Sequence, residues 1–307
     1  MVARESGIIV PVKRFGLVTM LVALAFVAPA RADEPVNVQW TTLLPALPSG
    51  IGNSGGPQPG CRKASMKRFD YTIKRLRRVR DRYGCDHRAV FATTYLTLTK
   101  VMKRTLEAEP RFFRDRDGII YQVALFSRIY FRTLKAYERG EPIPPAWQTA
   151  LDTATQTDQQ GAGDMLLGIN AHVQNDMPFM LAAITLRDAH GRSRKDDHDA
   201  ENEILDDAFD EVAREVVRRY DPLARIQLQT ISPGSDIFGA ELVKSWREGV
   251  WRNAEALVDA KSDAERAQVA ERIKAQASLT AGSIMAASQG PPGYRAQRDA
   301  YCAQQAA

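Results

Sequence analysis

Hydrophobic and polar positions follow a helical period through most of the chain beyond residue 61. Apolar residues three and four positions apart give each such segment one apolar face. Turn-forming residues separate the segments, for example Gly84, Pro110 and Gly140. We therefore predict helices over the ranges 62–83, 87–108, 118–139, 145–155, 163–189, 197–219, 238–258, 262–288 and 293–303.

The segment 226–231 alternates apolar and polar residues like a β-strand, but the sequence offers it no second strand. We therefore predict an all-α fold, a single compact domain of about eight or nine helices over residues 61–303. The range 163–189 is apolar around most of its circumference, both before residue 170 and after residue 178. This pattern predicts a buried central helix.

The amino terminus has the three parts of a secretory signal. Lys13 and Arg14 precede an apolar run over 15–29, and Ala30-Arg31-Ala32 is a small-x-small cleavage pattern. The run is short for a membrane span, so an uncleaved anchor is the alternative and a cleaved signal over 1–32 the prediction. The mature chain is then exported, periplasmic or secreted.

After this cleavage, residues 33–60 form an extended, Pro/Gly-rich lead-in, and no later segment reaches spanning length without charges. The whole chain has 42 basic and 37 acidic residues, but without residues 1–32 the numbers are 38 and 36. A net charge of +2 is a weak argument for nucleic acid, and we predict no specific nucleic-acid partner. The basic run over 63–82 is better explained as a solvated helix face.

Three cysteines, Cys61, Cys85 and Cys302, lie in the predicted mature chain, and exported proteins can form disulfides. A straight helix over 62–83 would hold Cys61 and Cys85 about 30 Å apart. Bridged Cα atoms lie within about 7 Å of each other, so that pair is out of reach. Cys302 is therefore expected to bond with either Cys61 or Cys85.

The first candidate site is the pair His172 and Asp176, four residues apart on one helix face. Such a spacing lets both side chains bind one metal ion, and it equally suits a buried hydrogen-bond network. Asn170 is a supporting polar residue of the same segment. Pro178 removes a helical hydrogen bond and is expected to kink the helix one turn past the pair.

His198 lies in a second polar segment, where Asp196 or Asp197 suits the N-cap of the following helix. A cation is unfavourable at a helix start, so His198 is expected to be neutral and able to bind a metal. Asn202 follows one turn later on the same face and could orient a ligand.

A third segment places His87 next to Asp86, which is a candidate N-cap for the helix that follows. Taken alone, this position predicts a histidine at the protein surface.

Five motifs along the chain can be compared with known families. The first is Asp86-His87 together with residues 89–92 and 95–96, and the second is 145–147. The third, which we call the central motif, is 167–179; the fourth is Asp197-His198-Asp199 together with Asn202, and the fifth is 246–255. Together they resemble an uncharacterised bacterial family called domain of unknown function 5995, over about 61–302. The resemblance implies no established activity. It does imply that His87, His172, Asp176 and His198 belong to the family signature, while His190 does not.

The central motif also resembles the helix of zinc phospholipase C and P1-type nucleases, in which such a histidine and aspartate bind zinc. This fainter likeness implies a divalent metal ion, zinc as the first choice, held by His172 and Asp176 together with one or both of His87 and His198. Four histidines in the chain are too few for the three-zinc cluster of those enzymes, so one or two ions are expected.

The leading function prediction is a metal-dependent hydrolase, in which Glu201 or Asp199 acts as the base on a metal-bound water. Phosphoester substrates follow only from the distant likeness. The alternative is an exported helical binding protein for a lipid or small apolar ligand, with Asn170, Asn202 and the His/Asp motif as a structural network. A scaffold of the cell envelope is the third possibility, and the sequence predicts no oligomeric state.

Overall fold

Helices make up almost all of the structure, a computed structural model that describes residues 65–224 and 240–306. Within these residues there is no β-strand, and all of them belong to one compact unit. The all-α prediction is therefore confirmed. The predicted signal (1–32), the lead-in (33–60), Cys61 and the whole segment 226–231 lie outside the described residues, so those predictions stay predictions.

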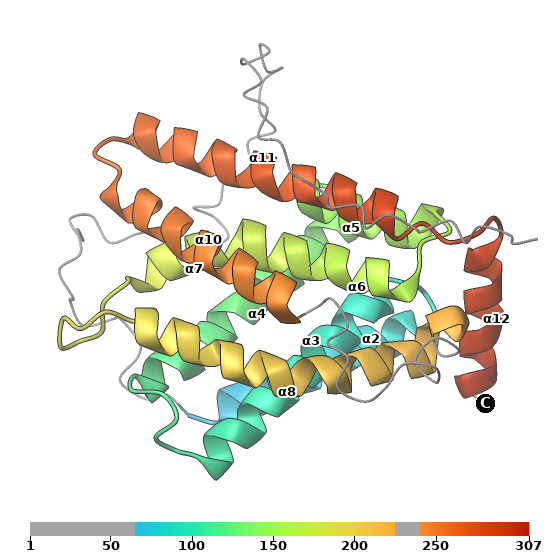
Figure 1. Ribbon diagram of the computed structural model, residues 1–307, viewed down its shortest axis with the longest axis horizontal. Helices are drawn as coiled ribbons and strands as arrows, with labels where there is room; N and C mark the ends of the chain where they lie inside the picture. Colours follow the sequence, from blue (N-terminus) through green and yellow to red (C-terminus); the bar gives the residue numbers. More distant parts are fainter. Residues whose placement is uncertain (1–64, 225–239, 307) are drawn as a thin grey trace, which may run out of the picture. The chain divides into compact units, whose positions relative to one another are not determined.

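The helices follow the predicted ranges within a few residues (Figure 1). They are α2 (Lys67–Tyr83), α3 (Ala89–Ala108), α4 (Arg116–Glu138), α5 (Pro145–Gln156), α6 (Gly161–Asn170), a π-helical segment (Ala171–Asp176), α7 (Met177–Ile184), α8 (Lys195–Tyr220), α10 (Ala240–Asp259), α11 (Asp263–Ala287) and α12 (Tyr294–Ala306). The predicted helix 163–189 ends early, at Ile184. Thr185 has a φ of 66°, and an α-helix cannot continue through this left-handed conformation.

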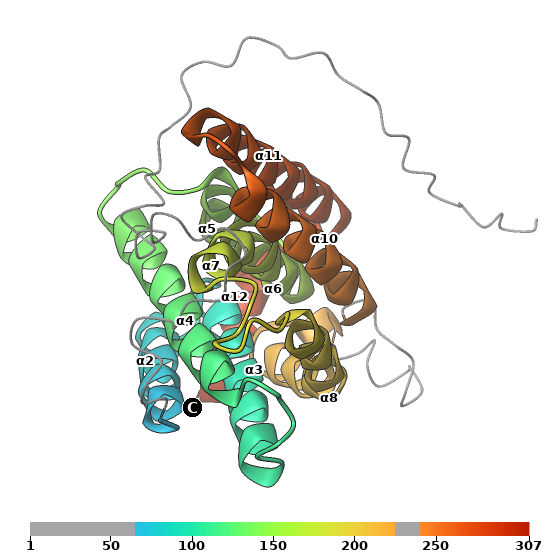
Figure 2. The same cartoon turned by 90° about the vertical axis from the view of Figure 1, so that its left-hand side faces the viewer.

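A central rod is formed by α6, the π segment and α7, which follow one another without a break. Figures 1 and 2 show this rod between α10 and α11 on one side and α3, α4 and α8 on the other. Every residue of α7 is buried, as are most residues of α6. A helix that is apolar on all sides gains most by taking the centre of the bundle, and the predicted buried helix is confirmed.

A π-helical turn directly precedes Pro178, the residue at which a kink was expected. Its wider turn closes with a hydrogen bond from the Met177 amide to the carbonyl of His172, five residues back. Pro178 then takes the second position of α7, where its missing N–H costs little. The helical conformation therefore continues through the proline, and α6, the π segment and α7 follow one another directly. Such π turns are frequent at functional sites.

Gly168 lets α3 approach α6 closely. A Cβ atom at this position would lie 2.3 Å from the Phe91 ring, far inside contact distance. A larger residue would therefore push Phe91 away from the rod.

The basic residues of α2 lie on its outer face, while Phe69, Thr72 and Leu76 pack inward. The exposed members of this face are Lys67, Lys74, Arg77, Arg78 and Arg82. The predicted solvated face is therefore confirmed. Within the described residues, no helix has the length and the apolar character that crossing a membrane requires.

Candidate functional site

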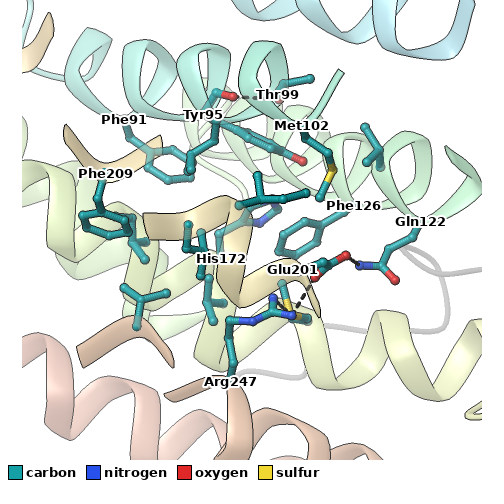
Figure 3. A pocket seen from close by; sticks show the side chains of 18 residues that line it. Phe91, Tyr95, Thr99, Met102, Gln122, Phe126, His172, Glu201, Phe209 and Arg247 are labelled. Atoms are coloured by element: carbon teal, nitrogen blue, oxygen red, sulfur yellow. Dashed lines mark hydrogen bonds and ion pairs between the residues drawn. The ribbon is translucent and has the colours of Figure 1, made fainter. Parts of the chain in front are cut away.

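An apolar cavity of about 110 Å³ lies beside the central rod (Figure 3). Side chains from α3, α4, α6, α8, α10, the π segment and the start of α7 line it. Among the apolar members are Phe91, Tyr95, Val123, Phe126 and Phe209. His172 from the π segment also lines the cavity, so the most specific motif of the sequence borders this space.

His172 and Asp176 bond to each other. Nδ1 of His172 lies 2.9 Å from Oδ2 of Asp176, and the carboxylate is completely buried. Trp147 Nε1 donates to the same oxygen at 2.9 Å, and Asn175 Nδ2 donates to Oδ1 at 2.7 Å. Because Trp147 and Asn175 can act only as donors here, both carboxylate oxygens are acceptors. Burial raises the pKa of Asp176, and the bonds from His172, Trp147 and Asn175 oppose this rise. We assign the carboxylate as ionised and the proton of the imidazole to Nδ1.

Burial decides the charge of His172. Desolvation lowers the pKa of its imidazole, and the bond to Asp176 only partly opposes this. The ring is stacked on Phe126 with centroids 3.5 Å apart, and Tyr95 lies 4.9 Å away. His172 is thus a neutral imidazole held between aromatic rings. Its Nε2 atom has no hydrogen-bond partner among the described residues.

Three side chains form the polar end of the cavity, namely Gln122, Glu201 and Arg247 (Figure 3). Nη2 of Arg247 lies 2.6 Å from Oε2 of Glu201, and Gln122 Nε2 donates to Oε1 at 2.8 Å. Burial raises the pKa of Glu201, while the guanidinium of Arg247 lowers it. A buried carboxylate beside a buried guanidinium forms a compensated pair, which joins α8 to α10.

His198 binds Arg247 rather than the cavity or an ion. Its Nε2 donates to the Arg247 carbonyl at 3.0 Å, and its Nδ1 accepts from Arg247 Nη2 at 3.2 Å. Burial and the neighbouring guanidinium lower the pKa of His198, so the ring is neutral, as expected. Both nitrogens are occupied, however, and neither is available to a metal. Asn202, which was expected to orient a ligand, accepts from Arg247 Nε at 2.8 Å.

The acidic residues near His198 have structural partners. Asp199 is on the surface, where Lys195 Nζ lies 2.6 Å from its Oδ1. Neither Asp196 nor Asp197 is the N-cap of α8, because the helix already begins at Lys195. Asp197 instead accepts from the backbone amides of Arg114 and Asp115, both at 2.8 Å. The expected N-cap is therefore corrected to a link between the α8 start and the loop before α4.

His87 is buried, in contrast to the surface position that its local sequence predicts. It belongs to a group that we call the C-terminal cluster, made of His87, Asp164, Arg298 and Asp299. Nε2 of His87 lies 3.0 Å from Asp299 Oδ1, and Arg298 Nη1 lies 2.7 Å from Asp164 Oδ2. Burial and two arginines lower the pKa of His87 to about 3. Burial raises the pKa of Asp164 to about 6. The local sequence does not indicate this burial, because Arg298 and Asp299, which lie beside His87, belong to α12 at the far end of the chain.

The four predicted metal ligands are not brought together. His172 and Asp176 bond to each other, His198 to Arg247, and His87 sits in the C-terminal cluster. In the described part of the chain, no three His, Cys, Asp or Glu side chains are grouped so that they could hold one ion. A zinc site needs three or four such ligands at one point. The residues therefore do not fit the expected zinc site.

Asn170 and the cysteines also have defined places. Asn170 donates from Nδ2 to the Ala277 carbonyl at 2.9 Å and accepts from Gln174 at 2.8 Å, which ties the rod to α11. Of the two pairings left open for Cys302, the structure has the bond to Cys85, with Cα atoms 5.6 Å apart. This disulfide joins α12 to the connection between α2 and α3.

Sequence reasoning missed Gln122, Trp147 and the roles of Glu201 and Arg247. A usable signal was present in the helix pattern. Arg247 falls on the apolar stripe of α10 between Val243, four residues before it, and Val250, three residues after it. A charged residue within an apolar stripe indicates a buried partner on a neighbouring helix, but it does not identify that partner.

Comparison with known proteins gives a family without an activity. The family model described as a family of unknown function, DUF5995, matches residues 69–287. No curated protein and no solved structure matches the chain. The match covers the central rod and every element that lines the cavity, and it ends before α12. The chain therefore belongs to this family of unknown function.

Proposed function

We propose that this protein binds a small apolar molecule in the cavity beside the central rod. The observation that carries the proposal is the cavity itself, about 110 Å³ in volume and lined mostly by aromatic and aliphatic side chains. An engineered apolar cavity of about 150 Å³ in another protein binds benzene. A six-membered ring or a short acyl chain therefore suits this space, and a full lipid would need it to widen.

Burial energetics support a ligand in this place. Close packing is the rule in protein interiors, and an unfilled space forfeits dispersion contacts along its walls. The aromatic walls from Phe91, Phe126 and Phe209 would regain those contacts against an apolar guest. Export of the protein, which the sequence predicts, is part of the proposal, and the Cys85–Cys302 disulfide suits an oxidising compartment.

Toluene is a suitable probe, measured by titration calorimetry and by the shift in unfolding temperature. Val123→Phe places a ring in the cavity and should reduce toluene binding at least tenfold. Ala124→Phe adds the same side chain at the next residue of α4, which does not line the cavity, and should bind toluene normally. Equal binding by the two variants, or no binding by the unaltered protein, would contradict the proposal.

A metal-dependent hydrolase remains a separate prediction, with zinc as its cofactor and Glu201 or Asp199 as its base. Its support is the likeness of the central motif, while the described residues offer no three-ligand group. Metal analysis of protein purified without chelator tests it. Near-stoichiometric zinc that is lost in His172→Ala would favour the hydrolase over the binding protein.

A further inference from the structure

Two polar atoms on the cavity residues have no hydrogen-bond partner among the described residues. They are Nε2 of His172 and the hydroxyl oxygen of Tyr95. His172 is 2% exposed and Tyr95 is 8% exposed, so bulk water does not replace the missing partners. Buried polar groups are nearly always hydrogen-bonded, and an exception at a cavity wall indicates a partner inside the cavity.

The two atoms offer opposite hydrogen-bonding capacity. Because Nδ1 of His172 carries the proton that faces Asp176, Nε2 presents a lone pair and can only accept. Burial raises the pKa of Tyr95 well above its ordinary value, so its hydroxyl keeps the proton and can donate. Both residues line the same cavity, and their rings lie 4.9 Å apart between centroids. A guest can therefore meet one donor and one acceptor.

The charges of the side chains that line the cavity favour an electrically neutral ligand. The guanidinium of Arg247 is already paired with Glu201, and the imidazole of His172 is neutral. A carboxylate or an ammonium group in the cavity would be buried without a counter-ion, which is costly. A carbonyl could accept from Tyr95 but would leave His172 unsatisfied. A hydroxyl group both donates and accepts.

We propose that the ligand of this cavity is a small apolar alcohol or phenol, whose hydroxyl donates to His172 Nε2 and accepts from the Tyr95 hydroxyl. This inference rests on the proposed function and adds the chemical class of the ligand. Asp176 and Trp147 position His172, because their bonds fix which nitrogen faces the guest. The polar residues of the family's central motif thereby form the recognition element of an apolar site.

Phenol and toluene test the inference, because they differ by a hydroxyl in place of a methyl group. In an apolar cavity without partners, phenol should bind much more weakly, since its hydroxyl loses its bonds to water. Here we expect phenol to bind at least as tightly as toluene in calorimetric titrations. Phenol should also shift the ¹⁵N resonance of His172 Nε2, and toluene should not.

Tyr95→Phe removes only the donor. The ratio of phenol affinity to toluene affinity should fall roughly three- to tenfold, the value of one hydrogen bond. Tyr220→Phe is the matched control, a buried tyrosine whose hydroxyl lies 3.0 Å from Thr93 Oγ1 and which does not line the cavity. Its affinity ratio should not change.

The possible failures are distinguishable. If toluene binds but phenol binds at least tenfold more weakly, or the ratio is the same in both variants, the hydroxyl inference is wrong and the apolar-ligand function stands. If neither compound binds, the proposed function fails and the inference fails with it.

Discussion

Two buried polar groups in this protein use the same residue types for different purposes. At the cavity, His172 and Asp176 bond to each other, and the side chain of His172 lines an apolar space. In the C-terminal cluster, His87 and Asp164 pack with Arg298 between α6 and α12, and the disulfide lies on the same helix. Both His87 nitrogens, like Nε2 of His172, have no hydrogen-bond partner among the described residues. The two groups differ because the first borders a cavity, whereas the second connects α12 to α6.

The family match contains the whole cavity group but only His87 and Asp164 of the C-terminal cluster. Residues 69–287 include every helix that lines the cavity, whereas Arg298, Asp299 and Cys302 lie beyond this range. A buried histidine beside a carboxylate therefore does not by itself mark a functional site. What matters is whether the remaining nitrogen borders a cavity or another part of the protein.

The largest loss in the free energy of unfolding is expected for Arg247→Met. The substitution leaves Glu201 buried without its cation and removes the side-chain donor to His198 Nδ1, while the backbone carbonyl that His198 Nε2 contacts stays in place. We expect the free energy of unfolding to fall by about 3–5 kcal/mol in urea titrations. Arg252→Met on the same helix removes only exposed pairs with Glu248 and Glu255 and should cost less than about 1 kcal/mol. Equal costs would show that the polar end does not hold α8 to α10.

Cys302→Ser should have the next largest effect and should separate the two groups. Losing a disulfide that spans 217 residues of sequence is expected to cost roughly 2–5 kcal/mol. Toluene affinity at low temperature should be unaffected, because α12 contributes no residue to the cavity. Cys61→Ser keeps the bond and is the control. A matching loss of toluene affinity in Cys302→Ser would mean that the two regions are coupled.

Gly168→Ala should destabilise the contact between α3 and the rod. The added Cβ would lie 2.3 Å from the Phe91 ring, so Phe91 must move, at a cost of about 1–3 kcal/mol. Because Phe91 lines the cavity, toluene binding should change as well. Gly249→Ala, inside α10 with open space around it, should stabilise the protein by up to about 1 kcal/mol. Thermal unfolding of the two variants should therefore shift in opposite directions.

The smallest effect is expected on the pH dependence of the free energy of unfolding, through His87 and Asp164 of the C-terminal cluster. The pKa of His87 is lowered to about 3, so its contribution to stability is complete above about pH 6.5 and is lost as pH falls toward 3. The pKa of Asp164 is raised to about 6, so its buried charge costs stability at higher pH, and this cost disappears between pH 6 and 4. The two contributions oppose each other in that window.

His87→Gln removes the first contribution only. Between pH 6 and 4 the variant should gain stability on acidification relative to the unaltered protein, by at most about 1.4 kcal/mol per pH unit. Urea unfolding at pH 4, 5 and 6 measures the difference. His190→Gln, in the exposed loop before α8, is the control for loss of a surface histidine. Parallel curves for His87→Gln and the unaltered protein would show that His87 ionises normally.

Much of the fold could be predicted because helix formation depends on local pattern. The apolar stripes and the glycine and proline breaks placed nearly every described helix within a few residues. The all-round apolar character of the range 163–189 placed it at the centre. The π turn was missed because the sequence shows that Pro178 disturbs a helix but not how the chain absorbs it.

The candidate site was predicted less well. His172 and Asp176 were singled out correctly as a pair, since their spacing alone brings them together. Gln122, Glu201 and Arg247 come from three different helices, and no sequence spacing connects them. Their grouping depends on how α4, α8 and α10 pack around the rod.

The sequence by itself determined the helices, the central position of the rod, the neutral state expected of His198 and the family to which the chain belongs. Tertiary structure alone decided that His87 is buried, that Cys302 bonds with Cys85, and that an apolar cavity borders His172. The physical reason is the range of the interactions. Helical periodicity acts between residues three or four apart, whereas burial, charge pairing and cavities arise between helices that are distant in the chain.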